Sequence, residues 1–482
     1  MENQQGQDGD IRVVNIPPLA QELRELLAND HSLEAQLGGS LPSCTIVIAE
    51  VRPLTRNVDE AMYDPHHVSI GPYHLLNNKR LVRSTEKIRS LGAVLSAASG
   101  GTPLDVEVYI QALDGLEVQA RKCYANSFGS NILPSRDFVR MLLLDGCYLL
   151  VNFCKISGGG RRSNSGADMP NGHVQVGTPS VPAAPGFDRL ETLAVVRDVF
   201  YLAENQIPFL VLDKILQITV SDPNAHAADR IMWFVQELLQ GLQYSVAMPP
   251  QTATRQAGNL LHLLHMHFEP TNPPPPDMAG DAAPGGKEKT LGRWRTATEY
   301  YFVGVTFKPR PLDAGGKVVR SILDVNLDGG TLEIPPLNID AETWRLLHNL
   351  MALEQRNPGA AGNHVTAYCV FMSQLACTAA DVDLLSSKGI IAHGLGNNGE
   401  VAHRFADLCK GIMFTLDDPR GNYLRGICWA LEERFQSRFR RWTAWLVRKY
   451  FDNPWLFIGL VAAAVGLACT VVQAVYAVLS YK

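Results

Sequence analysis

The most distinct pattern in the sequence is a long apolar stretch near its end. The 25 residues from Trp455 to Leu479 carry no charge. At about 1.5 Å per residue, a helix of this length crosses a hydrocarbon core of about 30 Å. A buried core helix is the alternative, but such helices rarely run this long without a polar stripe. We therefore predict a transmembrane anchor over 453–482, flanked by basic and aromatic residues: Arg440, Arg441, Arg448, Lys449 and Trp455.

Upstream of this stretch, apolar residues recur mostly with helical spacing. In the N-terminal segment 1–40, leucines mark an amphipathic helix from Asn15 to Leu37. Thr45 to Val51 is apolar and β-branched, which favours a buried strand or extended segment. Further helices are predicted over Leu81–Ala98, Leu104–Tyr124, Pro134–Phe153, Phe187–Ala203, Pro208–Val220, Ala227–Tyr244, Arg255–His267, Ala341–Gln355, Val365–Ala376, Ala380–Ile391, Glu400–Met413 and Gly421–Tyr450.

The spacing of the apolar residues changes between residues 300 and 336. Tyr300–Lys308, Lys317–Leu327 and Thr331–Leu337 have the pattern of strands, and Asp328-Gly329-Gly330 is a turn signal between the last two. The predicted fold is therefore mainly α: a helical globular body with a few short strands and one C-terminal transmembrane helix. The body spans 41–452 and contains two Gly- and Pro-rich inserts, 157–186 and 269–289, which are predicted to be mobile.

Charge and cysteine usage bear on the class of partner and on the cellular compartment of the body. The net charge of -5 leaves no basic field across the chain, so no nucleic-acid partner is expected. The first residues lack the regions of a signal peptide, and basic residues precede the predicted membrane helix. The nine cysteines form no C-x-x-C pair, and no N-x-S/T acceptor occurs. We expect contact with membrane lipid and a body on the cytosolic side.

The sequence carries no established catalytic motif such as HExxH, GxSxG or a complete phosphate loop. Gly285-Gly286-Lys287 is followed by Glu288 within a linker, and the D-x-D of Asp381 and Asp383 opens a helical pattern, where carboxylates complement the helix dipole. The segment HLLHMH places His262 and His265 on one helical face, where they could hold a metal. No carboxylate or cysteine stands nearby in sequence, so helix-face histidines are favoured and no metal or cofactor is predicted.

The segment Tyr63 to His74, YDPHHVSIGPYH, is predicted to be an ordered turn. Two prolines and a glycine exclude a regular helix. Its tyrosines and histidines could build an acid/base site, but no nucleophile or carboxylate pair accompanies them, and a structural turn is favoured.

Small residues at four-residue spacing mark the predicted membrane helix. Gly459 and Ala463, and likewise Ala462 and Gly466, would allow two helices to approach closely. Gln473 could form a hydrogen bond across such a pair, so a homo-oligomer through this helix is left open.

The turn resembles the hallmark Y-x-P-x-x-V-S-I-G-P-Y-H of the plant "domain of unknown function 247" family. The matching residues are Tyr63, Pro65, Val68, Ser69, Ile70, Gly71, Pro72, Tyr73 and His74. Similar blocks follow in order, among them LAENQIPFLVLDKIL, LEIPPLNID and LLHNLMALEQ. One departure is Ser84 to Lys87, which stands where a Met-Glu-x-x-Lys-like pattern is usual.

The resemblance implies a mostly helical plant protein with a C-terminal membrane helix and no established catalytic residues. Members at grass self-incompatibility loci resemble pollen-side determinants that recognise a small secreted pistil-side partner; the chain is either one of these or an ordinary paralogue. We hypothesise a single-pass, non-enzymatic recognition or scaffold protein with an unknown protein partner. A membrane-tethered enzyme that uses the turn from Tyr63 to His74 is the alternative.

Overall fold

The computed structural model describes residues 46–75, 81–98, 104–125, 133–154, 156, 189–271, 295–313, 318–418, 421–436 and 454–479. The chain divides into Met1–Cys44 and Thr45–Lys482, and the described residues belong to the second unit. Several predictions concern other residues: the helix from Asn15 to Leu37, the insert 157–186, most of the insert 269–289, and Arg440, Arg441, Arg448 and Lys449 lie outside the described ranges.

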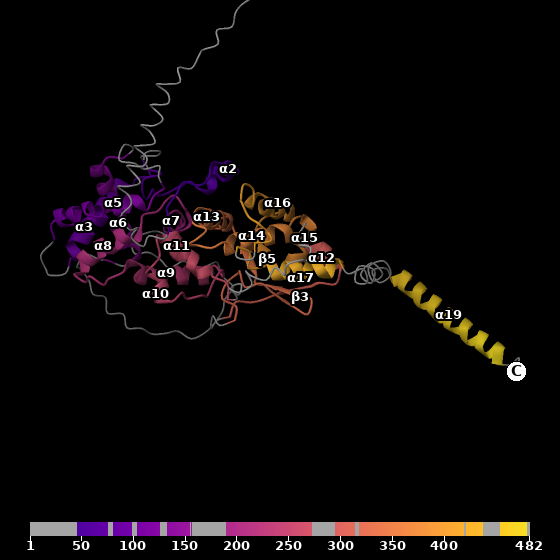
Figure 1. Ribbon diagram of the computed structural model, residues 1–482. Coiled ribbons are helices and arrows are strands. Elements are labelled where there is room, and N and C mark those ends of the chain that lie inside the picture. Colours follow the sequence, from indigo (N-terminus) through magenta and orange to yellow (C-terminus); the bar gives the residue numbers. More distant parts are fainter. Residues whose placement is uncertain are drawn as a thin grey trace, which may run out of the picture. The chain divides into compact units, whose positions relative to one another are not determined.

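The first half of the described body is helical. Helices α3 (Ser84–Ala97), α4 (Val106–Asp114), α5 (Glu117–Lys122) and α8 (Phe209–Val220) each pack on α6 (Ser135–Phe153) (Figure 1). Most side chains of α6 are buried because its apolar residues cover more than one face. The remaining elements are α2 (Pro53–Arg56), the 3-10 turn η1 (Glu60–Met62), α7 (Arg189–Val196), the π turn η2 (Arg197–Tyr201), α9 (Ala227–Gly241), α10 (Gln251–Thr254), α11 (Leu260–His265) and the 3-10 turn η3 (Met266–Phe268).

The second half of the body is built around α13 (Thr343–Arg356), whose side chains are buried from Thr343 to Glu354. It packs against α11, α14 (His364–Leu375) and α16 (Asn398–Leu408). α15 (Ala379–Ser387) contacts α12 (Ala297–Phe302) and α16, and α17 (Arg425–Gln436) is the last helix described before residue 454. These helices confirm the predicted mainly helical body.

The described part of the body also contains two small sheets. β1 (Thr306–Pro309) is parallel to β3 (Thr331–Ile334), and β2 (Asn326–Asp328) is antiparallel to β3 on its other side. β4 (Leu337–Ile339) pairs in parallel with β5 (Ile391–His393). Gly329 and Gly330 both have positive φ between β2 and β3, as the predicted turn requires. The small sheet expected around 300–336 is therefore present.

Three stretches near the sheets differ from the prediction. Residues 300–302 were predicted to be extended but are helical, because Thr296 and Glu299 form a capping box that starts α12. Most of 318–325 forms no strand, because Asp324 accepts the N–H groups of Arg320 and Ser321 and so competes with a strand ladder. The helix predicted to end at residue 391 ends at Ser387, and 391–393 form β5.

Helix α19 (Pro454–Leu479) covers the predicted membrane segment. Among the side chains that the structure describes, its apolar stretch runs over Ala462–Tyr476, and no single helix is long and apolar enough to cross a membrane. Among the described helices, one pair, α14 and α15, bent by 105°, passes together as a broken span, and it does so by length and composition alone. Both helices of that pair contribute buried side chains to the apolar core, including Tyr368, Phe371 and Val382.

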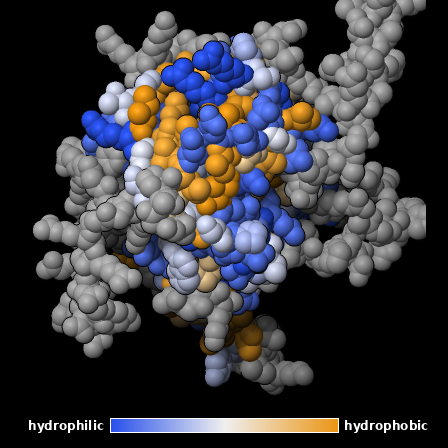
Figure 2. All heavy atoms as spheres, turned by 90° about the vertical axis from the view of Figure 1, so that its left-hand side faces the viewer, coloured by the Kyte–Doolittle hydropathy of each residue, from blue (hydrophilic) through white to orange (hydrophobic). Residues whose placement is uncertain are grey.

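The surface of the body carries both polar and apolar side chains. Figure 2 shows a face on which apolar side chains gather between polar ones. Exposed apolar side chains of the body include Ile88 on α3, Val108 and Ile110 on α4, and Leu54 on α2. The eight cysteines that the structure describes are all free thiols.

Candidate functional site

The hallmark segment lies directly after η1 and has no regular secondary structure. Its hallmark residues Tyr63, Pro65, Val68, Ser69, Ile70, Gly71, Pro72, Tyr73 and His74 are all buried. Only His66 is exposed within 63–74, and His67 is half-buried. The backbone of a buried irregular segment must find hydrogen-bond partners, and these come from elements far away in the sequence.

Asp198 binds the first part of the segment. Its Oδ2 accepts the N–H groups of His66, His67 and Val68 at 3.0, 2.5 and 3.0 Å. Three successive N–H groups that converge on one oxygen form an anion-binding nest. Asp198 is fully buried in the π turn η2, and the adjacent Arg197 Nε lies 3.4 Å from its Oδ1. The predicted helix Phe187–Ala203 thus widens into a π turn where it meets the hallmark segment.

The second part of the segment is bound by an ion pair and an amide. Ile70 N–H donates to Asn205 Oδ1 at 2.6 Å, and Gly71 N–H donates to Asp145 Oδ2 at 2.8 Å. Lys87 Nζ lies 2.5 Å from Asp145 Oδ1 and donates to the Ser69 carbonyl at 2.7 Å. Burial raises the pKa of Asp145, and the ammonium of Lys87 opposes that rise.

Gly71 lies very close to the backbone of Gln206. Its φ of +74° is left-handed, and an added Cβ would lie 2.3 Å from the carbonyl oxygen of Gln206. Only glycine fits this conformation and this contact without strain.

Glu204 lies beside His74 at the end of the segment. It accepts the Val51 N–H at 2.6 Å and binds Arg56 at 2.7 Å, and His74 Nε2 lies 3.4 Å away. Burial acts to raise the pKa of Glu204, but its neighbours His74, Val51 and Arg56 outweigh burial and hold this pKa below its usual value. The hallmark is evident in the sequence but its acidic partners are not, because Asp145, Asp198 and Glu204 lie 74 to 153 residues from the backbone N–H groups they bind.

A second cluster joins His265 of α11, Glu354 of α13 and His364 of α14. One ligand atom from each lies within 4.8 Å of the others, a spacing at which they could hold a metal ion. His265 Nε2 is 2.8 Å from Glu354 Oε1, and the rings of His265 and His364 are 4.8 Å apart. Burial lowers the pKa of both histidines to about 4 and raises that of Glu354. His265 is a candidate ligand from the sequence alone, but its carboxylate partner is not evident there, because 89 residues separate the two.

The other histidines of HLLHMH do not join this cluster. Gly258 N–H donates to His262 Nδ1 at 3.1 Å, and His267 Nδ1 lies 2.8 Å from the Ala247 carbonyl oxygen. Asp381 caps α15 through Thr378 and also accepts from Thr298, as its predicted place in a first helical turn implies. Asp383 lies near Asn398 at the surface, and Gly285, Gly286 and Lys287 lie outside the described residues.

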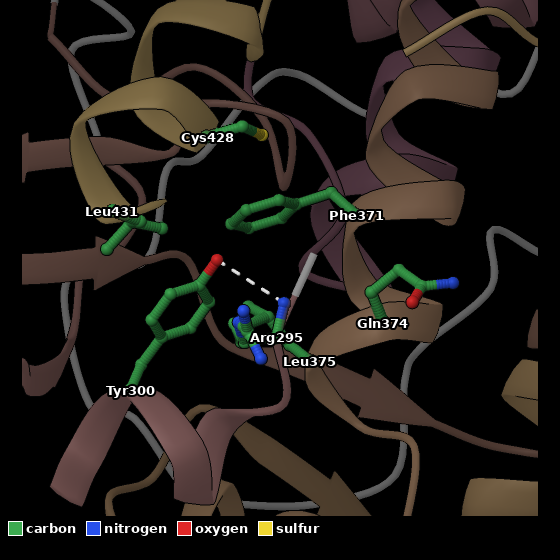
Figure 3. Close-up of a pocket in the computed structure, with 7 residues that line it drawn as sticks. All are labelled: Arg295, Tyr300, Phe371, Gln374, Leu375, Cys428 and Leu431. Carbon is green, nitrogen blue, oxygen red and sulfur yellow. Dashed lines mark hydrogen bonds between the residues drawn. The ribbon is translucent and has the colours of Figure 1, made fainter. Parts of the chain in front are cut away.

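Neither of two further pockets is large enough for a substrate. One lies at α12, α14 and α17, and in Figure 3 the Tyr300 hydroxyl points at the backbone nitrogen of Arg295, 3.4 Å away. Side chains fill it and leave no volume for a water molecule. The other, about 40 Å³, is lined by Val58, Asp59, Trp344, His348, Arg404 and Asp407.

Comparison with known proteins identifies the family. The family model for DUF247, plant protein of unknown function, matches residues 48–469. The UPF0481 protein At3g47200 of Arabidopsis thaliana is 26% identical over 438 residues, which cover 87% of this chain and 83% of that protein. A putative UPF0481 protein of the same plant, At3g02645, is 25% identical over 179 residues, 37% of this chain and 32% of its own length. No solved structure matches the chain significantly. The match over most of the chain confirms the resemblance, and the chain belongs to the DUF247 family of plant proteins of unknown function.

Proposed function

We propose that this protein is a membrane-anchored, non-enzymatic recognition or scaffold protein. The observation that carries the proposal is α19, a helix of 26 residues whose sequence has no charge from Trp455 to Leu479. At 1.5 Å per residue it is about 39 Å long. Its described side chains are exposed, among them Val465 and Val472. Beyond the described side chains of Ala462–Tyr476, the sequence of the helix stays apolar over Trp455–Leu479. A helix that is apolar on all sides needs lipid or protein to cover it, and the full 26 residues match the length of a membrane span.

Extraction of membranes with alkaline carbonate tests the anchor. We expect the full chain to stay in the membrane pellet and to be released by detergent. Val465→Lys together with Val472→Lys should release it, because each lysine at a helix centre opposes insertion by about 2.5–3.5 kcal/mol. Leu54→Lys is the control, since Leu54 is 69% exposed on the body. Release of the unchanged chain by carbonate alone would refute the anchor.

The proposed orientation places the body in the cytosol. It is supported by the basic residues before the helix, since positive charge is retained on the cytosolic side. Protease treatment of intact plant microsomes, with one tag at Met1 and another after Lys482, tests it. Digestion of the Met1 tag is expected, whereas protection of that tag until detergent is added would place the body on the opposite side.

The non-enzymatic part of the proposal is supported by the hallmark network. The acidic groups nearest the hallmark bind its backbone or pair with Lys87, Arg56 and Arg197. His74→Ala is therefore expected to lower soluble yield and helical content, while His66→Ala, at an exposed position, should not. A His74→Ala protein that stays folded but loses a measured activity would instead favour the enzyme alternative.

A pollen-side role in self-incompatibility is a narrower form of the proposal. Its support is the family membership, and the test is binding of the full chain to small secreted pistil proteins from matched and unmatched plants. Equal binding to both sets would speak against it.

A further inference from the structure

We propose that His265, Glu354 and His364 bind one divalent metal ion of the zinc class. This inference is independent of the membrane anchor. It departs from the sequence-based expectation of no metal, because two of the three ligands could not be paired with His265 from the sequence.

The spacing suits one ion. A tetrahedral zinc ion with ligand bonds of about 2.0–2.2 Å holds its ligand atoms about 3.4 Å apart. Here one pair of ligand atoms is 2.8 Å apart, and all three atoms lie within 4.8 Å of one another. Small rotations of the side chains therefore bring all three onto one ion. Two histidines and one glutamate are a set that zinc uses in sites with a fourth, open position.

The carboxylate is held in place by a second shell of donors. Glu354 Oε1 accepts the Val365 N–H at 2.9 Å, and Oε2 accepts the N–H and the hydroxyl of Thr366 at 2.7 and 2.6 Å. Such donors orient a ligating carboxylate before the ion arrives.

The burial of the Glu354 carboxyl group is the second observation that indicates an ion. Its side chain is completely buried. Within the described part of the chain its ion-pair partner is His265, and no Lys or Arg pairs with it. Buried carboxylates are normally paired, neutralised or bound to a metal. A divalent ion here would supply the missing positive charge, and the neutral imidazoles would supply the lone pairs that a metal requires.

One side of the cluster is partly exposed. His265 and Glu354 are buried, whereas His364 is only half-buried, so His364 is the ligand nearest to solvent. Gly362 has a φ of +70°, and a Cβ there would lie 3.2 Å from His364 Nδ1, so glycine leaves room for the imidazole. The bound ion would link α11, α13 and α14.

The test uses the full chain purified in detergent and stripped of metal by a chelator. Zn²⁺ is added and bound metal is measured by mass spectrometry after gel filtration; Co²⁺ is added separately as a spectroscopic probe of coordination. We expect one ion per chain and a Co²⁺ spectrum typical of nitrogen and oxygen ligands in four- or five-fold coordination. His364→Ala should weaken binding more than about 100-fold, the upper range for loss of an outer-shell partner.

His364→Ala is the decisive variant because its side chain is partly exposed, and the protein is expected to stay folded. His403→Ala is its control. His403 is 73% exposed and lies 2.8 Å from Asp407, so this pair tests whether an exposed histidine and carboxylate bind the metal instead of the proposed cluster. Unchanged binding after His364→Ala would overturn the proposal, as would loss of binding after His403→Ala alone. Failure of the unchanged folded chain to bind either metal stoichiometrically would also overturn it.

Discussion

The buried pair of Lys87 and Asp145 gives the sharpest test of the hallmark network. Lys87→Met removes an ammonium that lies 2.5 Å from the carboxylate, with both side chains 2% exposed. Methionine keeps much of the length and the apolar stem, so the main change is the loss of charge. The variant also leaves the Ser69 carbonyl without its donor. Removing one partner of a buried ion pair costs about 3–5 kcal/mol, because the other charge stays buried.

The matched control is Lys410→Met. Lys410 also lies 2.5 Å from a carboxylate, that of Asp407, but its side chain is 56% exposed. Solvent screens such a pair, and its loss should cost less than about 1 kcal/mol. Urea unfolding of each variant in mild detergent, followed by circular dichroism, gives the comparison through the shift in midpoint.

Two further results would complete the test. Without Lys87, the pKa of Asp145 should rise further, so the loss of stability should shrink at acidic pH as the carboxylate takes up a proton. Replacing both residues, Lys87→Met with Asp145→Leu, should recover part of the stability because no charge remains buried. Equal midpoints for Lys87→Met and Lys410→Met would refute the prediction, since the buried and the exposed ion pair would then contribute equally to stability.

Two other predictions concern backbone strain and pH. Gly71→Ala should cost about 2–5 kcal/mol from its left-handed φ and the clash with Gln206, while Gly304→Ala, with φ +83° and open space around it, should cost only about 1–2 kcal/mol; urea midpoints measure both, and equal shifts would contradict the clash. Burial lowers the pKa of His348 to about 4, with nearby Asp59, Asp407 and Arg404 acting as smaller influences, so the unfolded state binds the proton first as the pH falls below 6.5. The protein should therefore lose up to about 3 kcal/mol between pH 7 and 4 through this group, a loss that His348→Asn should lack in the same assay; identical pH profiles would contradict it.

Local signals in the sequence predicted most helices of the body. Helical spacing and proline at a helix start placed α6 and α8 to within two residues at either end. The error at 300–302 arose because aromatic residues favour strands in general, whereas the capping box of Thr296 and Glu299 decides the local structure. Strand β5 was missed because its partner β4 lies about 54 residues earlier, and three residues carry too little pattern to indicate a strand.

The candidate sites were less predictable than the fold, for a different reason. The sequence showed that the segment 63–74 must be ordered, but each of its acidic partners comes from a separate helix or turn. Similarly, His265 belongs to an evident histidine-rich motif, while Glu354 looks like one more carboxylate at the end of an amphipathic helix. Long-range pairing of this kind depends on the tertiary fold and leaves no periodic signal.

The two buried clusters differ in how their negative charges are balanced, and this difference separates their roles. In the hallmark network Asp145 faces Lys87, Glu204 faces Arg56, and Asp198 has Arg197 beside it. Each carboxylate there already has a permanent cation, so a further cation has no charge left to neutralise. Glu354 is equally buried, but among the described residues no Lys or Arg pairs with it, and its nearby histidines have pKa values that burial lowers. A cation therefore gains most at Glu354, which makes the cluster outside the family hallmark the better place to look for a bound ligand.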